Sequence, residues 1–277
     1  MNIANIVKGI GNRISGFYPQ GLATRVLAPT ALAMGASSCQ ILSDFNTFSP
    51  AQDVQMGEQA YGEILASEPT IGSGAEYNQV MRVTQNLVNA AHVVSPELAG
   101  MFEWQVSVID RPGTVNAFCL PGGKMAVYTG ILDVAQSDAG LAVVMGHEIA
   151  HALERHGTSA VSKQMVLQYG SVIAAGAILG GEGTDQQLAE MAILAATTLT
   201  TLSFGRDAEY EADLVGLEIM ARAGYDPREA VGFWQRMDAL GGAAGPEWLS
   251  THPSNANRIR QIQEALPGAI PLYEAAR

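Results

Sequence analysis

The chain contains few basic residues. It has 15 Lys and Arg against 27 Asp and Glu, which gives a formal net charge of −12. Proteins that bind nucleic acids contact the phosphates through Lys and Arg, and no basic patch follows residue 39. This shortage excludes a general nucleic-acid binder, so we expect no nucleic-acid partner.

Charged residues and long hydrophobic runs are also scarce. Charged residues make up 15% of the 277 residues and hydrophobic residues 48%, which is typical of a packed globular protein and not of a disordered chain. Two apolar runs cover residues 165–181 and 191–205. The first is near the lower length limit of a membrane span and the second is too short. We interpret them as a packed helical hairpin; the alternative is a hairpin that dips into a membrane surface.

Cysteine occurs only twice, and Cys39 follows a segment that has basic residues and no acidic one. The apolar stretch VLAPTALAMGASS leads directly to it. This pattern predicts a secretory signal over residues 1–38 with lipid attachment at Cys39. Conventional cleavage after Ala33 or Ala36 is one alternative, and an incidental cysteine behind a poorly ordered segment is another. A lipidated Cys39 leaves Cys119 as a structural thiol.

Histidine is scarce as well, with five residues, yet two of them flank a glutamate in HEIAH at 147–151. His147 and His151 are four apart, so on a helix they share one face and can share one metal ion. Glu148 can then reach a water on that metal. Ser137 is the expected N-cap and Gly157 the expected end of the helix. The alternative is a buried histidine pair on an ordinary core helix.

A second helix is predicted over residues 203–224, which contain RDAEYEAD. Glu209 and Asp213 are four apart and share a face. Glu209 is the candidate third ligand, and Asp213 can accept the free N–H of a ligating histidine. Glu211 points elsewhere on the helix and is the weaker candidate. The alternative is a solvated acidic helix start, which the helix dipole favours. Three protein ligands with one open position are typical of a catalytic zinc ion, one per chain.

The remaining pattern predicts a single domain. After a tether at 39–48, the domain covers 49–277 and begins with the capping box Ser49-Pro50-Ala51-Gln52 and a helix to about Ser67. A second helix is expected over 75–91. Three strands are expected within 102–110, 115–123 and 124–130, the last two joined at residues 121–123. This order gives an α+β fold with a small sheet over the HEIAH helix.

Four segments together resemble the M48 family of zinc metallopeptidases, which belong to the gluzincins. They are HEIAH, RDAEYEAD, NAFCLPGGKMAVYTGIL at 116–132 and STHPSNANRIRQI at 250–262, and the resemblance covers roughly residues 49–266. It implies a mainly helical zincin-type domain in which His147, His151 and Glu209 hold zinc and Glu148 is the general base. It also implies that the strand around Asn116, Ala117 and Phe118 is a sheet edge that binds the substrate main chain.

The resemblance further implies that the His-Pro segment faces the metal. Pro253 and Ser254 are expected to begin a helix that runs to about Leu266, with His252 on the loop before it. Two roles fit His252: it occupies the fourth metal position and keeps the enzyme latent, or together with Arg258 it stabilises the oxyanion. A loop cap at His252 and a surface position for Arg258 are the alternative.

The likeness is greatest to bacterial envelope members of the family, a lipoprotein peptidase and an outer-membrane quality-control peptidase. It implies a zinc endopeptidase on the periplasmic side of the outer membrane, held by a lipid anchor and acting on misfolded or misassembled envelope polypeptides. Two other functions stay open: a chaperone-like assembly factor that uses the same cleft, and a lipoprotein in which zinc only stabilises the fold. His156 has a simpler explanation as a dipole contact near a helix C-terminus, and the tryptophans are expected in the core.

Overall fold

The computed structural model describes residues 46–169, 203–241, 245–253 and 256–277, all within one compact unit. The predicted signal, Cys39, most of the tether and most of the two apolar runs lie outside these residues. Among the described helices, none combines the length and the hydrophobicity that crossing a membrane requires.

A mixed four-stranded sheet forms the centre of the described unit, in the order β1-β2-β4-β3. Its strands are β1 (Thr70–Ile71), β2 (Gln105–Ile109), β3 (Ala117–Cys119) and β4 (Lys124–Tyr128). β2 and β4 are parallel, whereas β3 and β4 form an antiparallel hairpin. The hairpin turns at Gly122 and Gly123, whose φ angles of 78° and 95° favour glycine. The strand order places β3 at an edge of the sheet, as expected.

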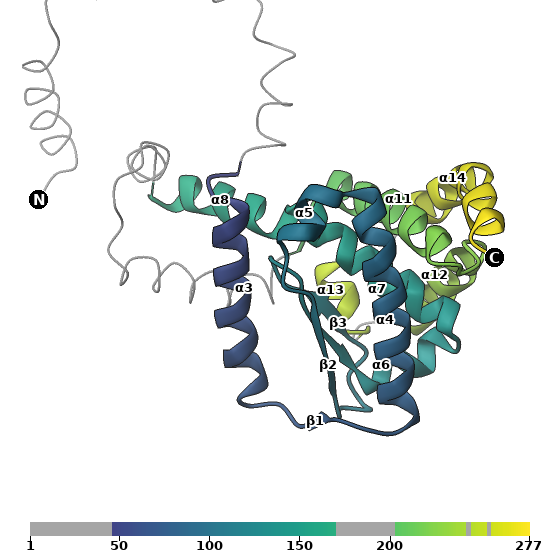
Figure 1. The fold of residues 1–277 in the computed structure, drawn as a ribbon, viewed down its shortest axis with the longest axis horizontal. Helices are drawn as coiled ribbons and strands as arrows, with labels where there is room; N and C mark the ends of the chain where they lie inside the picture. Colours follow the sequence, from purple (N-terminus) through teal and green to yellow (C-terminus); the bar gives the residue numbers. More distant parts are fainter. Residues whose placement is uncertain (1–45, 170–202, 242–244, 254–255) are drawn as a thin grey trace, which may run out of the picture. The chain divides into compact units, whose positions relative to one another are not determined.

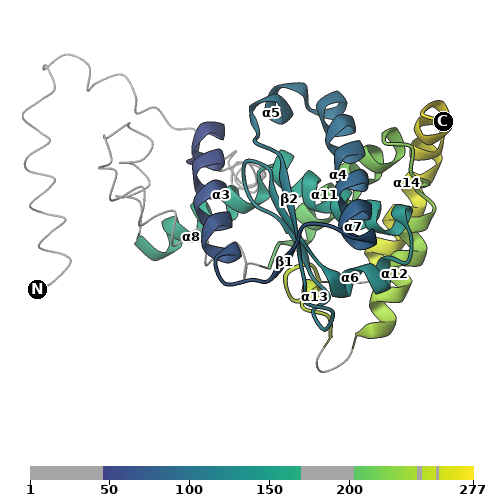
Figure 2. The same ribbon diagram turned by 60° about the horizontal axis from the view of Figure 1, so that its bottom comes forward.

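Helices cover both faces of the sheet (Figures 1 and 2). On one side lies α3 (Pro50–Leu65), which begins with the predicted capping box at Ser49. On the other side lie α4 (Ala75–Val94) and α7 (Asp138–Leu153), and α5 (Pro96–Met101) precedes β2. Beyond α7 are α11 (Arg206–Arg222), α12 (Glu229–Leu240) and α14 (Ala256–Ala275). This arrangement confirms the α+β class, with a small sheet against the HEIAH helix.

Helix α7 is deeply buried, because every residue from Gly140 to Leu153 is buried. Ser137 caps its start by accepting a hydrogen bond from the Gly140 N–H at 3.0 Å. Helix α11 crosses α7 at Gly146 and Gly216. A Cβ on Gly216 would lie 2.8 Å from the His147 nitrogen, and one on Gly146 would lie 2.9 Å from the Gly216 oxygen. The two backbones therefore touch directly beside a predicted metal ligand.

The helix that contains HEIAH does not end where the sequence predicted. Helix α7 ends at Leu153, and Gly157 lies inside the next helix, α8 (His156–Tyr169). The reversal is made by Arg155 in the left-handed region at φ 54°. Its guanidinium holds this conformation, because it pairs with the buried carboxylate of Asp53 at 2.6 Å and also binds the Phe48 carbonyl. A side chain from α3 thus replaces the expected glycine.

The sequence predicted that the last helix ends at about Leu266, and this was wrong. Helix α14 continues through Pro267 and Pro271 to Ala275. Each proline removes one helical hydrogen bond, yet packing against α11 and α12 buries Ile262 and Ala269 and keeps the helix continuous.

The strands also differ from the sequence pattern. β4 ends at Tyr128, and the residues expected to extend it begin a short helix, α6 (Thr129–Ala135). The two-residue strand β1 had no periodic signal and arises by antiparallel pairing with β2. The end of the predicted tether is packed: Asn46 donates to the Thr158 hydroxyl at 2.8 Å, and the Thr47 N–H donates to Ser162 at 3.0 Å, both on α8.

The glycine contact between α7 and α11 gives the first prediction. Gly216→Ala places a methyl group against the His147 backbone, so we expect a loss of about 1–3 kcal/mol in the free energy of unfolding, measured by urea denaturation. Gly62→Ala, in α3, is the control, because nothing lies within 4 Å of a Cβ there; it should raise the stability by up to about 1 kcal/mol. Equal stability of the two variants contradicts the close crossing.

Candidate metal centre

Four side chains converge where α7, α11 and α13 (Trp248–Thr251) meet: His147, His151, Glu209 and His252. One ligand atom from each lies within 4.8 Å of all the others, and all four residues are buried. The Nε2 atoms of His147 and His151 are 3.0 Å apart. Glu209 Oε1 lies 3.4 Å from His151 Nε2, and Glu209 Oε2 lies 3.5 Å from His147 Nε2. The structure therefore brings together the three predicted ligands and places beside them His252, for which a fourth metal position was one of the two predicted roles.

The spacing and the chemistry of this donor set fit zinc. Ligand atoms around a tetrahedral zinc ion, with bonds of about 2.0–2.1 Å, lie about 3.3 Å from one another. His252 Nδ1 is 3.2 Å from His147 Nε2 and 3.0 Å from Glu209 Oε1, so the fourth donor has the same spacing as the first three. Imidazole and carboxylate donors are those that zinc takes in proteins.

A buried guanidinium lies behind these ligands. Arg258, on α14, is 0% exposed and binds Asp213 through two nitrogens, both at 2.7 Å. A third nitrogen lies 2.6 Å from Glu209 Oε2, and the guanidinium lies 3.8 Å from the centre of the Trp234 ring. Asp213 in turn lies 3.1 Å from His147 Nδ1. Asp213 thus takes the predicted position behind His147, a candidate ligand, and Arg258 is bound to the carboxylates and does not line the cleft.

The electrostatics of the site favour positive charge between the ligands. Burial acts to raise the pKa of Glu209, but its contacts with the histidines hold that pKa well below its usual range. Burial also acts to raise the pKa of Asp213, and Arg258 lowers it. Burial acts to lower the pKa of His147, yet Asp213 and Glu209 raise it to about 9. A metal cation held by these groups would replace the proton that His147 otherwise attracts.

Glu148 lies on the cleft side of the same cluster. The Trp248 Nε1–H donates to its Oε1 at 2.7 Å, and His252 Nε2 lies 3.3 Å from the same oxygen. The sequence pattern placed Trp248 only in the core, and nothing local in the sequence pointed to this contact. A hydrogen bond from the Trp248 N–H to the Val115 carbonyl, at 3.1 Å, ties α13 to the segment that leads into β3 and helps to place this side chain.

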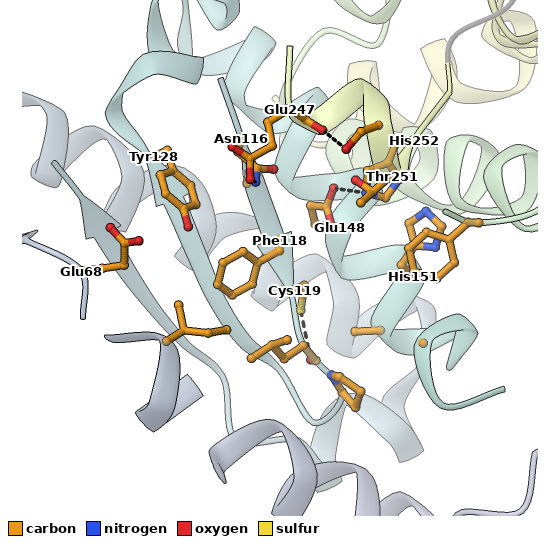
Figure 3. A pocket seen from close by; sticks show the side chains of 18 of the residues that line it. Glu68, Asn116, Phe118, Cys119, Tyr128, Glu148, His151, Glu247, Thr251 and His252 are labelled. Atoms are coloured by element: carbon orange, nitrogen blue, oxygen red, sulfur yellow. Dashed lines mark hydrogen bonds and ion pairs between the residues drawn. The ribbon is translucent and has the colours of Figure 1, made fainter. Parts of the chain in front are cut away.

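A cleft of about 460 Å³ opens in front of the cluster (Figure 3). Glu148, His151 and His252 face one end of it, and Phe118, Tyr128 and Glu68 lie along the other part. The edge strand β3 forms one wall, so the cleft includes the predicted substrate residues Asn116, Ala117 and Phe118, together with Cys119.

The hydrogen bonds of β3 show which main-chain groups face outward. The Leu120 N–H donates to the Lys124 carbonyl at 2.7 Å, and the Tyr128 N–H donates to the Asn116 carbonyl at 3.1 Å. Because an antiparallel strand alternates its bonding side, the main chain of Ala117 and Cys119 faces away from β4. The outward Ala117 N–H donates a hydrogen bond of 2.9 Å to the side-chain oxygen of the neighbouring Asn116.

Sequence reasoning also missed two neighbours of His151. His156 Nδ1 lies 2.9 Å from His151 Nδ1, so His156 has a partner in the metal site and is not merely a dipole contact. The ring of Phe204 stacks on His151 with centroids 4.2 Å apart and on His252 with centroids 5.4 Å apart. The only available signal was the position of His156, five residues after His151.

The buried guanidinium gives a second prediction. Arg258→Ala leaves the carboxylates of Asp213 and Glu209 buried without their cation, so we expect a loss of about 3–5 kcal/mol in the free energy of unfolding, measured by urea denaturation. Arg260→Ala, on the same helix, is the control. Arg260 is exposed and lies 3.9 Å from Glu264, so its loss should change stability by less than about 1 kcal/mol. Similar losses in both variants rule out the buried ion pairs as the cause.

Comparison with known proteins agrees with this geometry. Residues 75–266 match peptidase family M48. The chain is 34% identical to the mitochondrial metalloendopeptidase OMA1 of Schizosaccharomyces pombe over 81% of this chain, and 30% identical to the protein of that name from Arabidopsis thaliana over 95%. It is 29% identical to the beta-barrel assembly-enhancing protease of Escherichia coli over 77%. The chain spans 64%, 55% and 44% of the lengths of these three relatives. The family match covers well over half of the chain, and the chain therefore belongs to peptidase family M48, a family of zinc metallopeptidases.

Proposed function

We propose that this protein is a zinc-dependent endopeptidase with polypeptide substrates. The observation that carries the proposal is the convergence of His147, His151 and Glu209 beside Glu148, at the end of an open cleft whose wall is an edge strand. Zinc held by the three ligands would polarise the scissile carbonyl and lower the pKa of the attacking water towards neutrality.

The chain's own residues supply the remaining steps. Glu148 takes a proton from the attacking water and passes it to the leaving amine. The Trp248 indole holds one Glu148 oxygen at 2.7 Å, which leaves the other oxygen for the proton. The outward main chain of β3 pairs with an extended substrate, and such pairing tolerates many side chains. Asp213 and Arg258 hold the ligands in place and, in this proposal, do not contact the oxyanion.

The structure supports a latent role for His252. Its Nδ1 lies at ligand spacing from His147 and Glu209, and its Nε2 lies 3.3 Å from Glu148. An imidazole at this place fills the position that water and the scissile carbonyl need. His252 must therefore move before a substrate is cleaved. We propose the latch, and not oxyanion binding, as its role in the described state.

For location and substrates, we propose an exported, lipid-anchored protein on the periplasmic side of the outer membrane that cleaves misassembled envelope polypeptides. The basic and apolar pattern before Cys39 supports export. The similarity to a protease of Escherichia coli named for beta-barrel assembly supports the substrate class. Metabolic labelling with a radioactive fatty acid tests the anchor, because a Cys39→Ser variant should lose the label. Equal labelling of both proteins contradicts it.

Replacement of the proposed base gives a third prediction. Glu148→Gln should lower the rate of casein cleavage by at least about 100-fold, while the zinc content stays near one per chain because no ligand changes. Cleavage is followed with labelled casein, and metal by mass spectrometry. Glu154→Gln, the same change at the exposed C-cap of α7, should leave cleavage unaltered. Full proteolysis by the Glu148 variant refutes the assigned role.

Removal of the proposed latch gives a fourth prediction. His252→Ala should retain zinc through the three remaining ligands and should cleave casein several-fold faster, because the fourth position becomes open to substrate. The rate is compared with that of Thr251→Ser, a small change at the neighbouring position. A variant that keeps zinc but loses cleavage instead assigns His252 to stabilisation of the transition state.

A further inference from the structure

The two metal histidines differ in what binds their second ring nitrogen. His147 Nδ1 lies 3.1 Å from a carboxylate oxygen of Asp213, the usual arrangement behind a ligating imidazole. His151 Nδ1 instead lies 2.9 Å from the Nδ1 of another imidazole, that of His156. His156 lies at the start of α8, five residues after His151, and the Arg155 turn brings its ring back to α7.

The contact does not end at His156. Its Nε2 lies 3.1 Å from Glu211 Oε2 on α11. The His156 side chain is 10% exposed, whereas that of Glu211 is 56% exposed. A line of three side chains therefore runs from solvent, through a nearly buried imidazole, to a buried metal ligand. Glu211 lies two residues after Glu209, so α11 contributes to both the inner and the outer part of the site.

With His156 neutral, one arrangement of hydrogens satisfies the whole line. An ionised carboxylate only accepts hydrogen bonds, so His156 donates its Nε2–H to Glu211. In the neutral imidazole the other nitrogen is then an acceptor, and His156 Nδ1 accepts the Nδ1–H of His151. His151 is left with a lone pair on Nε2, the atom that faces His147 and Glu209. This is the form that binds a metal.

The stacking partner of His151 cannot do this. Phe204 lies against the ring face at 4.2 Å, which restrains the plane of the ring but does not select the nitrogen that carries the hydrogen. We propose that His156 and Glu211 are positioning residues, which hold His151 in the tautomer and orientation of a metal ligand. The inference rests on the proposed zinc site, and it assigns to this pair the task that Asp213 has for His147.

The test measures zinc affinity of the full chain by competition with a chromophoric chelator, with no need for turnover. His156→Leu removes the acceptor and should weaken zinc binding about 10–100-fold. His156→Asn places an amide oxygen where the Nδ1 acceptor stood and should restore most of that affinity. Glu211→Leu should weaken binding by a smaller factor, because solvent can replace the exposed carboxylate.

Glu218→Leu is the matched control for Glu211→Leu. It removes a carboxylate from the same helix that is 40% exposed and pairs with Arg222 at 2.7 Å, away from the histidines, so zinc affinity should not change. Unaltered affinity in folded His156→Leu overturns the inference. An equal loss in the Leu and Asn variants also overturns it, because packing alone would then explain the effect.

Two further readouts separate the possible failures. If His156→Leu does not fold, as judged by circular dichroism, the zinc affinities of Glu211→Leu and Glu218→Leu test the positioning role instead. Equal zinc affinities of these two variants reject it. If the unmodified chain binds no zinc, the proposed function itself fails. Zinc binding by the unmodified chain together with normal binding by the variants rejects only the inference.

Discussion

The close crossing of α7 and α11 is the constraint on which the metal site depends. The ligands come from different helices, and their side chains can meet only if the two backbones approach closely. Gly146 and Gly216 allow that approach, because no Cβ separates the helices beside His147. A small shift of α11 would move Glu209 and Asp213 together, since both are fixed to the same helical face. The arrangement of the donor side chains is therefore a consequence of backbone packing.

Burial of so many charged groups needs its own compensation. Glu148, Glu209, Asp213 and Arg258 are all buried, and isolated charges in such an environment are strongly unfavourable. Arg258 offsets two of the carboxylates at once, and its planar fork makes the paired contact that a lysine could not make. The remaining negative charge faces the space between the imidazoles, where it favours a cation. The same ion pairs therefore support both the fold and the metal site.

On the cleft side, the site is completed by the short helix α13 and not by a long helix. Glu148 is held by Trp248, and His252 lies one turn further along at the end of the short helix α13. This helix is attached through the Val115 carbonyl and through the Phe204 N–H, which donates to the Thr251 carbonyl. The fourth donor thus comes from the end of a four-residue helix beside the cleft, whereas the other three donors come from the long helices α7 and α11. This difference suits the proposed latch, in which three donors stay in place and His252 moves away from them.

The sequence by itself determined the features that depend on local geometry: the ligand types and their four-residue spacing, the caps at Ser49 and Ser137, and the glycine turn of the β3–β4 hairpin. It also predicted the edge strand and the place of Asp213. Each of these follows from helical periodicity, hydrogen bonding within a turn or a resemblance of short segments.

Only the tertiary structure decided the contacts between distant segments. Trp248 meets Glu148 across 100 positions, and His156 meets Glu211 across 55. The sequence left Arg258 either at the oxyanion or on the surface. It instead lies behind the ligands, because α14 packs along α11 and brings its guanidinium to Asp213, 45 positions earlier. Gly157 failed as a helix end for the same reason, since a carboxylate from α3 stabilises Arg155 in the turn. Side chains that pair across elements leave no periodic trace in the sequence, because their spacing is set by packing.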